Sequence, residues 1–104
     1  MTRKKAAHLL SERELEAVAR HFRILAEPMR LRILQSICRE PKTVTEIIKD
    51  TGATQTNVSK HLALLTLTKI VSRRKAGAFV YYKLEDALTL KLCRLVHAES
   101  RARG

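Results

Sequence analysis

Hydrogen-bonding and cationic side chains are concentrated in one part of this 104-residue sequence. Residues 54–61 read TQTNVSKH, and the basic run Arg73-Arg74-Lys75 follows shortly after. Between Thr51 and Leu84 there is no Asp or Glu, although the whole chain has 10 of them against 21 Lys and Arg. Such side chains hydrogen-bond to base edges and neutralise phosphates. The segregation of charge, with a formal net charge of +11, therefore predicts a nucleic-acid-binding surface.

The remaining polar residues do not form an arrangement that is typical of an enzyme. The sequence has no paired-carboxylate, Ser-His-Asp or Gly-rich phosphate-binding pattern. Its histidines are scattered among predicted helices, at His8, His21, His61 and His97. We therefore expect a non-enzymatic protein that needs no cofactor.

Composition and length limit the class of protein further. A chain of 104 residues forms one domain with a modest core, so association with a second copy would help to bury apolar surface. No apolar run could cross a bilayer, and residues 1–10 lack the pattern of a signal peptide. Cys38 and Cys93 are the only cysteines, which suits a reducing compartment without a structural disulfide. We expect a cytoplasmic protein.

Capping residues and breaks predict four helices before residue 70. Capping boxes, Ser11 with Glu14 and Thr43 with Glu46, begin the first and the third helix. Pro28 suits the first turn of the second, which we expect over residues 29–39. A left-handed stop at Gly52 separates the third helix from a fourth over residues 54–67. The last two helices form a predicted helix-turn-helix with residues 54–67 as the recognition helix.

Apolar residues at helical spacing predict which face of each helix is buried. The expected core positions are Leu15, Val18, Phe22 and Leu25 in the first helix; Leu31, Leu34 and Cys38, widened by Ile33 and Ile37, in the second; Val44, Ile47 and Ile48 in the third; and Val58, Leu62, Leu64 and Leu65 in the fourth.

A β-hairpin and a last helix are predicted after Val71. Residues 71–75 and 78–84 alternate on either side of Ala76-Gly77, and Val80, Tyr82 and Leu84 would face the core. This hairpin would act as a wing that lays its basic residues along a phosphate backbone. The helix over residues 85–101 carries an apolar stripe that needs cover from the first helix and from a second chain. The residues of this stripe are Leu88, Leu92, Leu95 and Val96.

Four segments in this order resemble the ArsR/SmtB family of winged-helix transcriptional repressors. They are residues 25–34 (LAEPMRLRIL), 43–47 (TVTEI), 59–65 (SKHLALL) and 80–84 (VYYKL). The resemblance covers about Ala19 to His97. It implies a mainly α winged helix-turn-helix over residues 11–104, after a basic arm of residues 1–10. Lys69 stands where the family has a glycine, so we expect a different turn there.

The resemblance also implies a homodimer, joined through its first and last helices, that binds an inverted-repeat operator on double-stranded DNA and is released by an inducer. We expect base contacts from Gln55, Thr56 and Ser59, and phosphate contacts from Lys60 and the wing. The full candidate set is Thr54, Gln55, Thr56, Asn57, Ser59, Lys60, His61, Arg73, Arg74 and Lys75. A non-specific DNA binder and a winged helix that binds protein remain alternatives, and any single cation here could be an ordinary surface charge.

This sequence lacks the ligand patterns of the metal sites that are known in the family. The third helix continues Glu46-Ile47-Ile48 without the Cys-x-Cys pair of arsenic sensors. For the zinc type, Asp86 matches the first ligand and Glu99 the third, but Leu88 replaces the histidine and Ala102 the fourth ligand. Two carboxylates make a poor zinc site, although His97 is near them in sequence. No metal site is predicted.

Cys38 and Cys93 offer another inducer chemistry. Relatives that sense sulfur or redox state carry one cysteine in each of the same two helices, although at different positions. Thiol sensing by this pair is therefore one hypothesis. The alternative is that both cysteines are structural, because free cysteine is commonly a small buried apolar residue.

Overall fold

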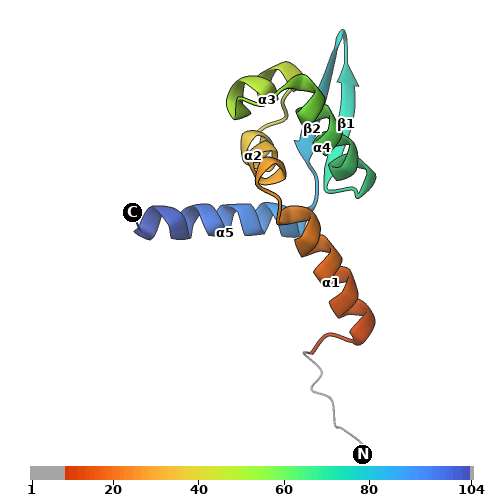
Figure 1. The fold of residues 1–104 in the computed structure, drawn as a ribbon, viewed down its shortest axis with the longest axis vertical. Helices are drawn as coiled ribbons and strands as arrows, with labels where there is room; N and C mark the ends of the chain where they lie inside the picture. The colour runs from red at the N-terminus through yellow and green to blue at the C-terminus, as the bar shows by residue number, and fades with distance from the viewer. Residues whose placement is uncertain (1–8, 104) are drawn as a thin grey trace, which may run out of the picture.

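The computed structural model describes residues 9–103, so most of the predicted basic arm lies outside the described residues. The chain forms four helices, a two-stranded antiparallel hairpin and a fifth helix, in the order predicted (Figure 1). The bounds are α1 Glu12–Leu25, α2 Pro28–Ile37, α3 Val44–Thr51, α4 Gln55–Leu67, β1 Val71–Ala76, β2 Phe79–Leu84 and α5 Ala87–Arg103. No helix in residues 9–103 is long and apolar enough to cross a membrane.

The predicted helix caps are confirmed. The Ser11 hydroxyl accepts a hydrogen bond from the Glu14 amide, and the Glu14 carboxylate accepts one from the Ser11 amide. The same reciprocal pair joins Thr43 and Glu46 at the start of α3. Gly52 ends α3 with a φ of 73°, a left-handed conformation that glycine adopts without steric cost. These caps fix where the helix-turn-helix begins and where it turns.

The core lies between α2, α3, α4 and the base of the hairpin. Val58, Leu62 and Leu65 of α4 are buried as predicted. In α2 the predicted core residues Ile33, Leu34 and Ile37 are buried and Cys38 is partly buried, but the prediction was wrong for Leu31, which is 46% exposed. The α2 sequence is apolar on more than one side, so the positions of α3 and α4 decided which side was covered. The buried apolar residues are Leu25, Ile33, Leu34, Ile37, Ile47, Val58, Leu62, Leu65, Ile70, Val71 and Leu84.

The turn after α4 keeps a left-handed residue even though it has no glycine. Lys69 has a φ of 64° and is the only non-glycine residue with positive φ in residues 9–103. Its amide donates to the Thr66 carbonyl, and the Ile70 amide donates to the Leu65 carbonyl, both at 3.0 Å. This pair of bonds is the Schellman arrangement that usually ends in glycine. The expected change of turn at Lys69 was therefore wrong, because the backbone conformation is retained and lysine bears the strain.

The wing pairs in a register that sets which side chains share a face. The turn lies at Gly77-Ala78, one residue later than predicted, and Gly77 takes a φ of 63°. Arg73 lies opposite Tyr82, and Val71 opposite Leu84. Tyr82 also pairs with Lys42 on its other side, with amide-to-carbonyl distances of 3.0 and 2.8 Å. The base of the wing is therefore fixed to the segment between α2 and α3.

Helices α1 and α5 leave this body in different directions (Figure 1). Only the first part of α5 packs against the core, through Leu90, Leu92 and Cys93, with Thr89 buried beside them, and every residue from Arg94 to Arg103 is exposed. Of the apolar stripe predicted on α5, only Leu92 is partly covered in the single chain. The prediction that α1 of the same chain would cover it was wrong, because Leu15 and Phe22 of α1 are themselves 47% and 50% exposed. The exposed stripe residues of α5 are Leu88, Leu95 and Val96.

Candidate nucleic-acid interface

The first two turns of α4 present most of the predicted DNA-contacting residues to solvent. Gln55, Thr56, Ser59 and Lys60 are exposed, and Asn57 is half-buried. Thr54 precedes the helix as its cap, and its hydroxyl accepts from the Asn57 amide at 3.1 Å. Its side chain is therefore engaged in capping, while the four exposed side chains are available to a ligand.

His61 was predicted to project with this group, and the structure contradicts that orientation. Its side chain is buried, with 7% exposure, and points toward α2. The His61 Nε2 atom lies 3.6 Å from the Glu27 carboxylate, and its Nδ1 atom 3.3 Å from the Arg30 guanidinium. The Arg30 contact makes Nδ1 the acceptor and places the ring proton on Nε2, facing Glu27. His61 thus joins α4 to the start of α2.

A polar network surrounds that junction. The Glu27 carboxylate caps α2 by accepting from the Arg30 amide at 2.9 Å, and this hydrogen bond lowers the pKa of Glu27. Arg30 Nε donates to the Ile24 carbonyl at 2.7 Å. The start of α2 and the middle of α4 are therefore held by hydrogen bonds as well as by the core, which fixes the orientation of the recognition helix.

The basic residues of the wing are divided between its two faces. Arg73 and Lys75 lie opposite Tyr82 and Val80, so they share one face of the hairpin, and on that face Arg73 lies across from α4. Arg74 lies opposite Tyr81 on the other face. All three side chains are exposed. The basic run of the sequence is therefore divided in space, with Arg73 and Lys75 on one face of the hairpin and Arg74 on the other.

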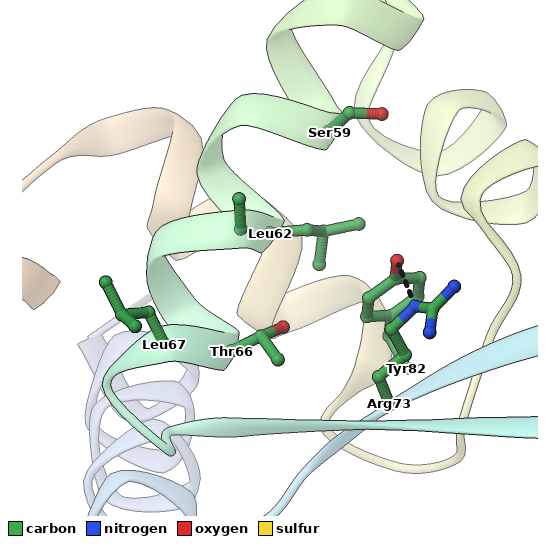
Figure 2. Close-up of a pocket in the computed structure, with 7 residues that line it drawn as sticks. Ser59, Leu62, Thr66, Leu67, Arg73 and Tyr82 are labelled. Atoms are coloured by element: carbon green, nitrogen blue, oxygen red, sulfur yellow. Dashed lines mark hydrogen bonds between the residues drawn. The ribbon is translucent and has the colours of Figure 1, made fainter.

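A hollow separates α4 from the wing (Figure 2). One wall is the side of α4 with Ser59, Ala63 and Thr66, and the other wall holds Arg73 and Tyr82. Arg73 Nε donates to the Tyr82 hydroxyl at 3.3 Å across the two strands. Tyr82 and Thr66 were not predicted as site residues. The pairing of Arg73 with Tyr82 was implicit in the hairpin register, but the position of Thr66 depends on how the wing folds back toward α4.

Cys38 and Cys93 pack against the same hydrophobic core although they come from different elements, the end of α2 and the first half of α5. Both are free thiols and partly buried. Burial raises the pKa of the Cys93 thiol, and Cys38 raises it further. Cys93 is consequently a weak nucleophile at neutral pH, because the thiolate is the reactive form.

The acidic residues of α5 have other partners or lie apart. Asp86 caps this helix, accepting from the Thr89 hydroxyl at 2.6 Å and from the Thr89 amide at 2.9 Å, and it lies 3.5 Å from His21 of α1. Burial opposes its ionisation, but these hydrogen bonds and His21 keep the pKa of Asp86 lowered. His97 and Glu99 are exposed. Within residues 9–103, no group of three or more His, Cys, Asp or Glu side chains could hold a metal ion.

The helix-turn-helix, the wing and the polar surface of α4 define a winged helix-turn-helix DNA-binding protein. Residues 27–72 match the family model for bacterial regulatory proteins of the arsR family. A probable mercury resistance operon repressor from Streptomyces lividans is 37% identical over 90 residues, which cover 84% of this chain and 72% of the relative. The chain belongs to the ArsR family of DNA-binding transcriptional regulators, which are not enzymes.

Solved structures agree with this assignment. The transcriptional regulator HlyU from Vibrio vulnificus superposes with a TM-score of 0.78 at 26% identity, covering 84% of this chain and 91% of HlyU. A homodimeric winged helix-turn-helix DNA-binding domain from Mycobacterium bovis gives a TM-score of 0.74 at 29% identity, covering 94% of this chain and 93% of that domain. The prediction of an ArsR-type winged helix is confirmed.

Proposed function

We propose that this ArsR-family repressor binds a palindromic operator as a homodimer and is released by an inducer. The observation that carries the proposal is the exposed polar side of α4, with Gln55, Thr56, Ser59 and Lys60, continued by Arg73 on the facing side of the wing. The intervening and flanking residues carry no carboxylate from Gly52 to Lys83. A surface with that charge attracts the phosphate backbone, while its hydroxyl and amide groups suit base edges.

The uncovered apolar residues of α1 and α5 support the homodimer. Leu88, Leu95 and Val96 are each about half exposed or more, at 49%, 59% and 62%. Exposed apolar patches of this kind mark association surfaces, and a two-fold axis through them would bury the same residues twice. Two recognition helices related by such an axis reach successive major grooves about 34 Å apart, which requires an operator with inverted repeats.

Binding to a palindromic duplex at several salt concentrations tests this function. We expect log K to fall linearly with log salt, with a slope near −0.9 for each phosphate contacted, and random duplex to bind orders of magnitude more weakly. Equal affinity for random DNA would identify a non-specific binder instead. A flat salt response with weak DNA affinity would favour a winged helix that binds protein.

Thiol chemistry at Cys38 and Cys93 is the inducer mechanism that a specific observation favours. Both thiols pack against the same core from different elements, and, after burial, Cys38 is the second cause of the raised pKa of Cys93. Joining them as a disulfide transfers two electrons and two protons to an oxidant such as hydrogen peroxide, which is reduced to water. Such a disulfide would link the end of α2 to α5. It would thereby change the orientation of the two α4 helices relative to each other in the proposed dimer.

The raised pKa of Cys93 favours the alternative, in which both cysteines have only a structural role in the core. The test therefore compares thiol sensing with this structural role. Operator affinity is measured for the reduced and the peroxide-treated or polysulfide-treated dimer, with Cys38→Ser as the control. Loss of affinity in the wild type alone would support thiol sensing. Unchanged affinity in both proteins would leave the cysteines with a structural role.

A further inference from the structure

We propose that the hollow between α4 and the wing seats one phosphate of the DNA backbone, with Arg73 as its principal ligand and Tyr82 as the residue that positions Arg73. This inference rests on the proposed function, since it concerns how the same surface holds DNA. It assigns DNA-binding roles to Thr66 and to Tyr82, which the sequence pattern placed only in the core, and it separates Arg73 from its neighbour Arg74.

Arg73 is held at one end and free at the other. Its Nε atom donates to the Tyr82 hydroxyl at 3.3 Å, and within residues 9–103 its two terminal nitrogens have no hydrogen-bonded or ionic partner. A guanidinium fixed through Nε presents its terminal N–H groups in one plane. That geometry matches the two oxygens of a phosphate, which arginine binds through paired hydrogen bonds.

Tyr82 is the more rigid of the two residues. Its backbone N–H and C=O are both hydrogen-bonded to Lys42, while Arg73 lies opposite it in the hairpin as a non-hydrogen-bonded pair, so Tyr82 is anchored from outside the hairpin. Its hydroxyl accepts from Arg73, which leaves the phenolic hydrogen free to donate. The same atom can therefore orient the guanidinium and donate to an anion beside it.

The α4 wall of the hollow adds hydroxyl groups at matching positions. Ser59 and Thr66 lie on the same side of the helix, with the small side chain of Ala63 between them. The Thr66 hydroxyl is buried and has no hydrogen-bond partner in the described structure, and it points toward the wing in Figure 2. A buried hydroxyl without a hydrogen-bond partner costs free energy, and a rotation of this side chain when the hollow is occupied would let the hydroxyl donate to an acceptor of the occupant.

The charge of the side chains that line the hollow favours an anionic occupant. None of the side chains that line the hollow is acidic, and Arg73 is the charged one among them. An α-helix lying in a major groove brings the flanking backbone up against its sides, and the wing is the element that meets that backbone. A backbone phosphate between Ser59 and Arg73 therefore fits both the chemistry and the position of the hollow.

The experiment uses a 30-base-pair duplex chosen from a random-sequence library by repeated binding to the wild-type protein. Each backbone phosphate of that duplex is replaced in turn by a neutral methylphosphonate, and the affinity is measured for every substituted duplex. We expect at least one position in each half-site where the wild type loses affinity and Arg73→Ala loses none, because its partner is already gone.

The variants give a graded series on the unmodified duplex. Arg73→Ala should bind about tenfold more weakly or worse, with its salt slope reduced by about 0.9 per half-site. Tyr82→Phe should lose about threefold to tenfold at unchanged thermal stability, and Arg73→Ala with Tyr82→Phe should lose no more than Arg73→Ala alone. Thr66→Val should weaken binding by about threefold while the protein becomes no less stable, because it removes the unsatisfied hydroxyl.

Arg74→Ala is the matched control, since it removes the same charge from the opposite face of the same strand. The proposal is overturned if Arg74→Ala reproduces every effect of Arg73→Ala, or if Tyr82→Phe changes neither the affinity nor the methylphosphonate profile. Either result would leave the proposed function intact. Failure of the library to yield any bound duplex would overturn the proposed function itself and this inference with it.

Discussion

The unit formed by α2, α3, α4 and the wing contains nearly all the buried apolar residues of the described chain, whereas α1 contributes only Leu25 to them and α5 none. Ile33, Ile47 and Leu65 are fully buried in the first region, but Leu95 and Val96 of the second are more than half exposed. The side chains that the first region exposes at the start of α4 are polar and are suited to a charged ligand. The DNA-binding unit therefore has its own core within one chain, and the exposed apolar residues of the flanking helices are those that the proposed homodimer would cover.

Removing core packing from α4 should produce the largest effect. Leu65→Ala deletes a fully buried side chain, and we expect the free energy of unfolding to fall by about 2–5 kcal/mol. Leu67→Ala, two residues along the same helix, removes a side chain that is 79% exposed and should change it by no more than about 0.5 kcal/mol. Denaturant unfolding followed by circular dichroism measures both. Similar losses of unfolding free energy in the two variants would show that Leu65 contributes no more to the core than the exposed Leu67.

Shortening an exposed apolar side chain of α5 should weaken the association of two chains and leave the fold of the DNA-binding unit unchanged. Leu95→Ala removes apolar area at a proposed dimer contact, so we expect the dimer dissociation constant to rise by about 10- to 100-fold. Sedimentation equilibrium measures this constant, and helix content should be unchanged in the monomer. Leu67→Ala serves again as the control because it lies on α4. A dissociation constant unchanged by Leu95→Ala would remove Leu95 from the interface.

The polar link between α1 and α5 should give a smaller effect that depends on pH. Because the pKa of Asp86 is lowered in the folded chain, its contribution is present above the unfolded pKa of an aspartate, near 4, and is lost as pH falls through the lower folded value. We expect Asp86→Asn to reduce the decline in stability between pH 5 and pH 3, by no more than about 1 kcal/mol. Thermal unfolding across this range measures it. Some decline should remain, since the pKa values of Glu27 and Asp50 are also lowered. An identical decline in the variant would contradict the role of Asp86.

The smallest expected effect concerns the turn that joins α4 to the wing. Lys69→Gly relieves a left-handed lysine but adds freedom to the unfolded chain, so we expect a net gain of about 0.5 kcal/mol. Lys49→Gly, at an exposed position within α3, should instead lose about 1 kcal/mol. Differential scanning calorimetry compares the melting temperatures. A loss in Lys69→Gly would mean that the lysine side chain stabilises the turn in a way its backbone does not reveal.

Interactions between residues close in sequence were predictable. The capping boxes at Ser11 and Thr43 and the stop at Gly52 follow from side chains that reach the backbone within three or four residues. The hairpin followed for the same reason, because glycine and alternating apolar residues define it locally. These features were sufficient to place the recognition helix and the wing, and with them the charged surface.

The tertiary structure alone decided what those elements face. His61 could have pointed outward with Lys60, but Glu27 and Arg30 from the start of α2 offered it partners. The packing of Cys38 and Cys93 against one core, the buried side of α2 and the hollow that includes Thr66 also depend on elements far apart in the chain. Periodicity gives the faces of a helix, but the partner of each face is chosen by packing, which no local pattern contains.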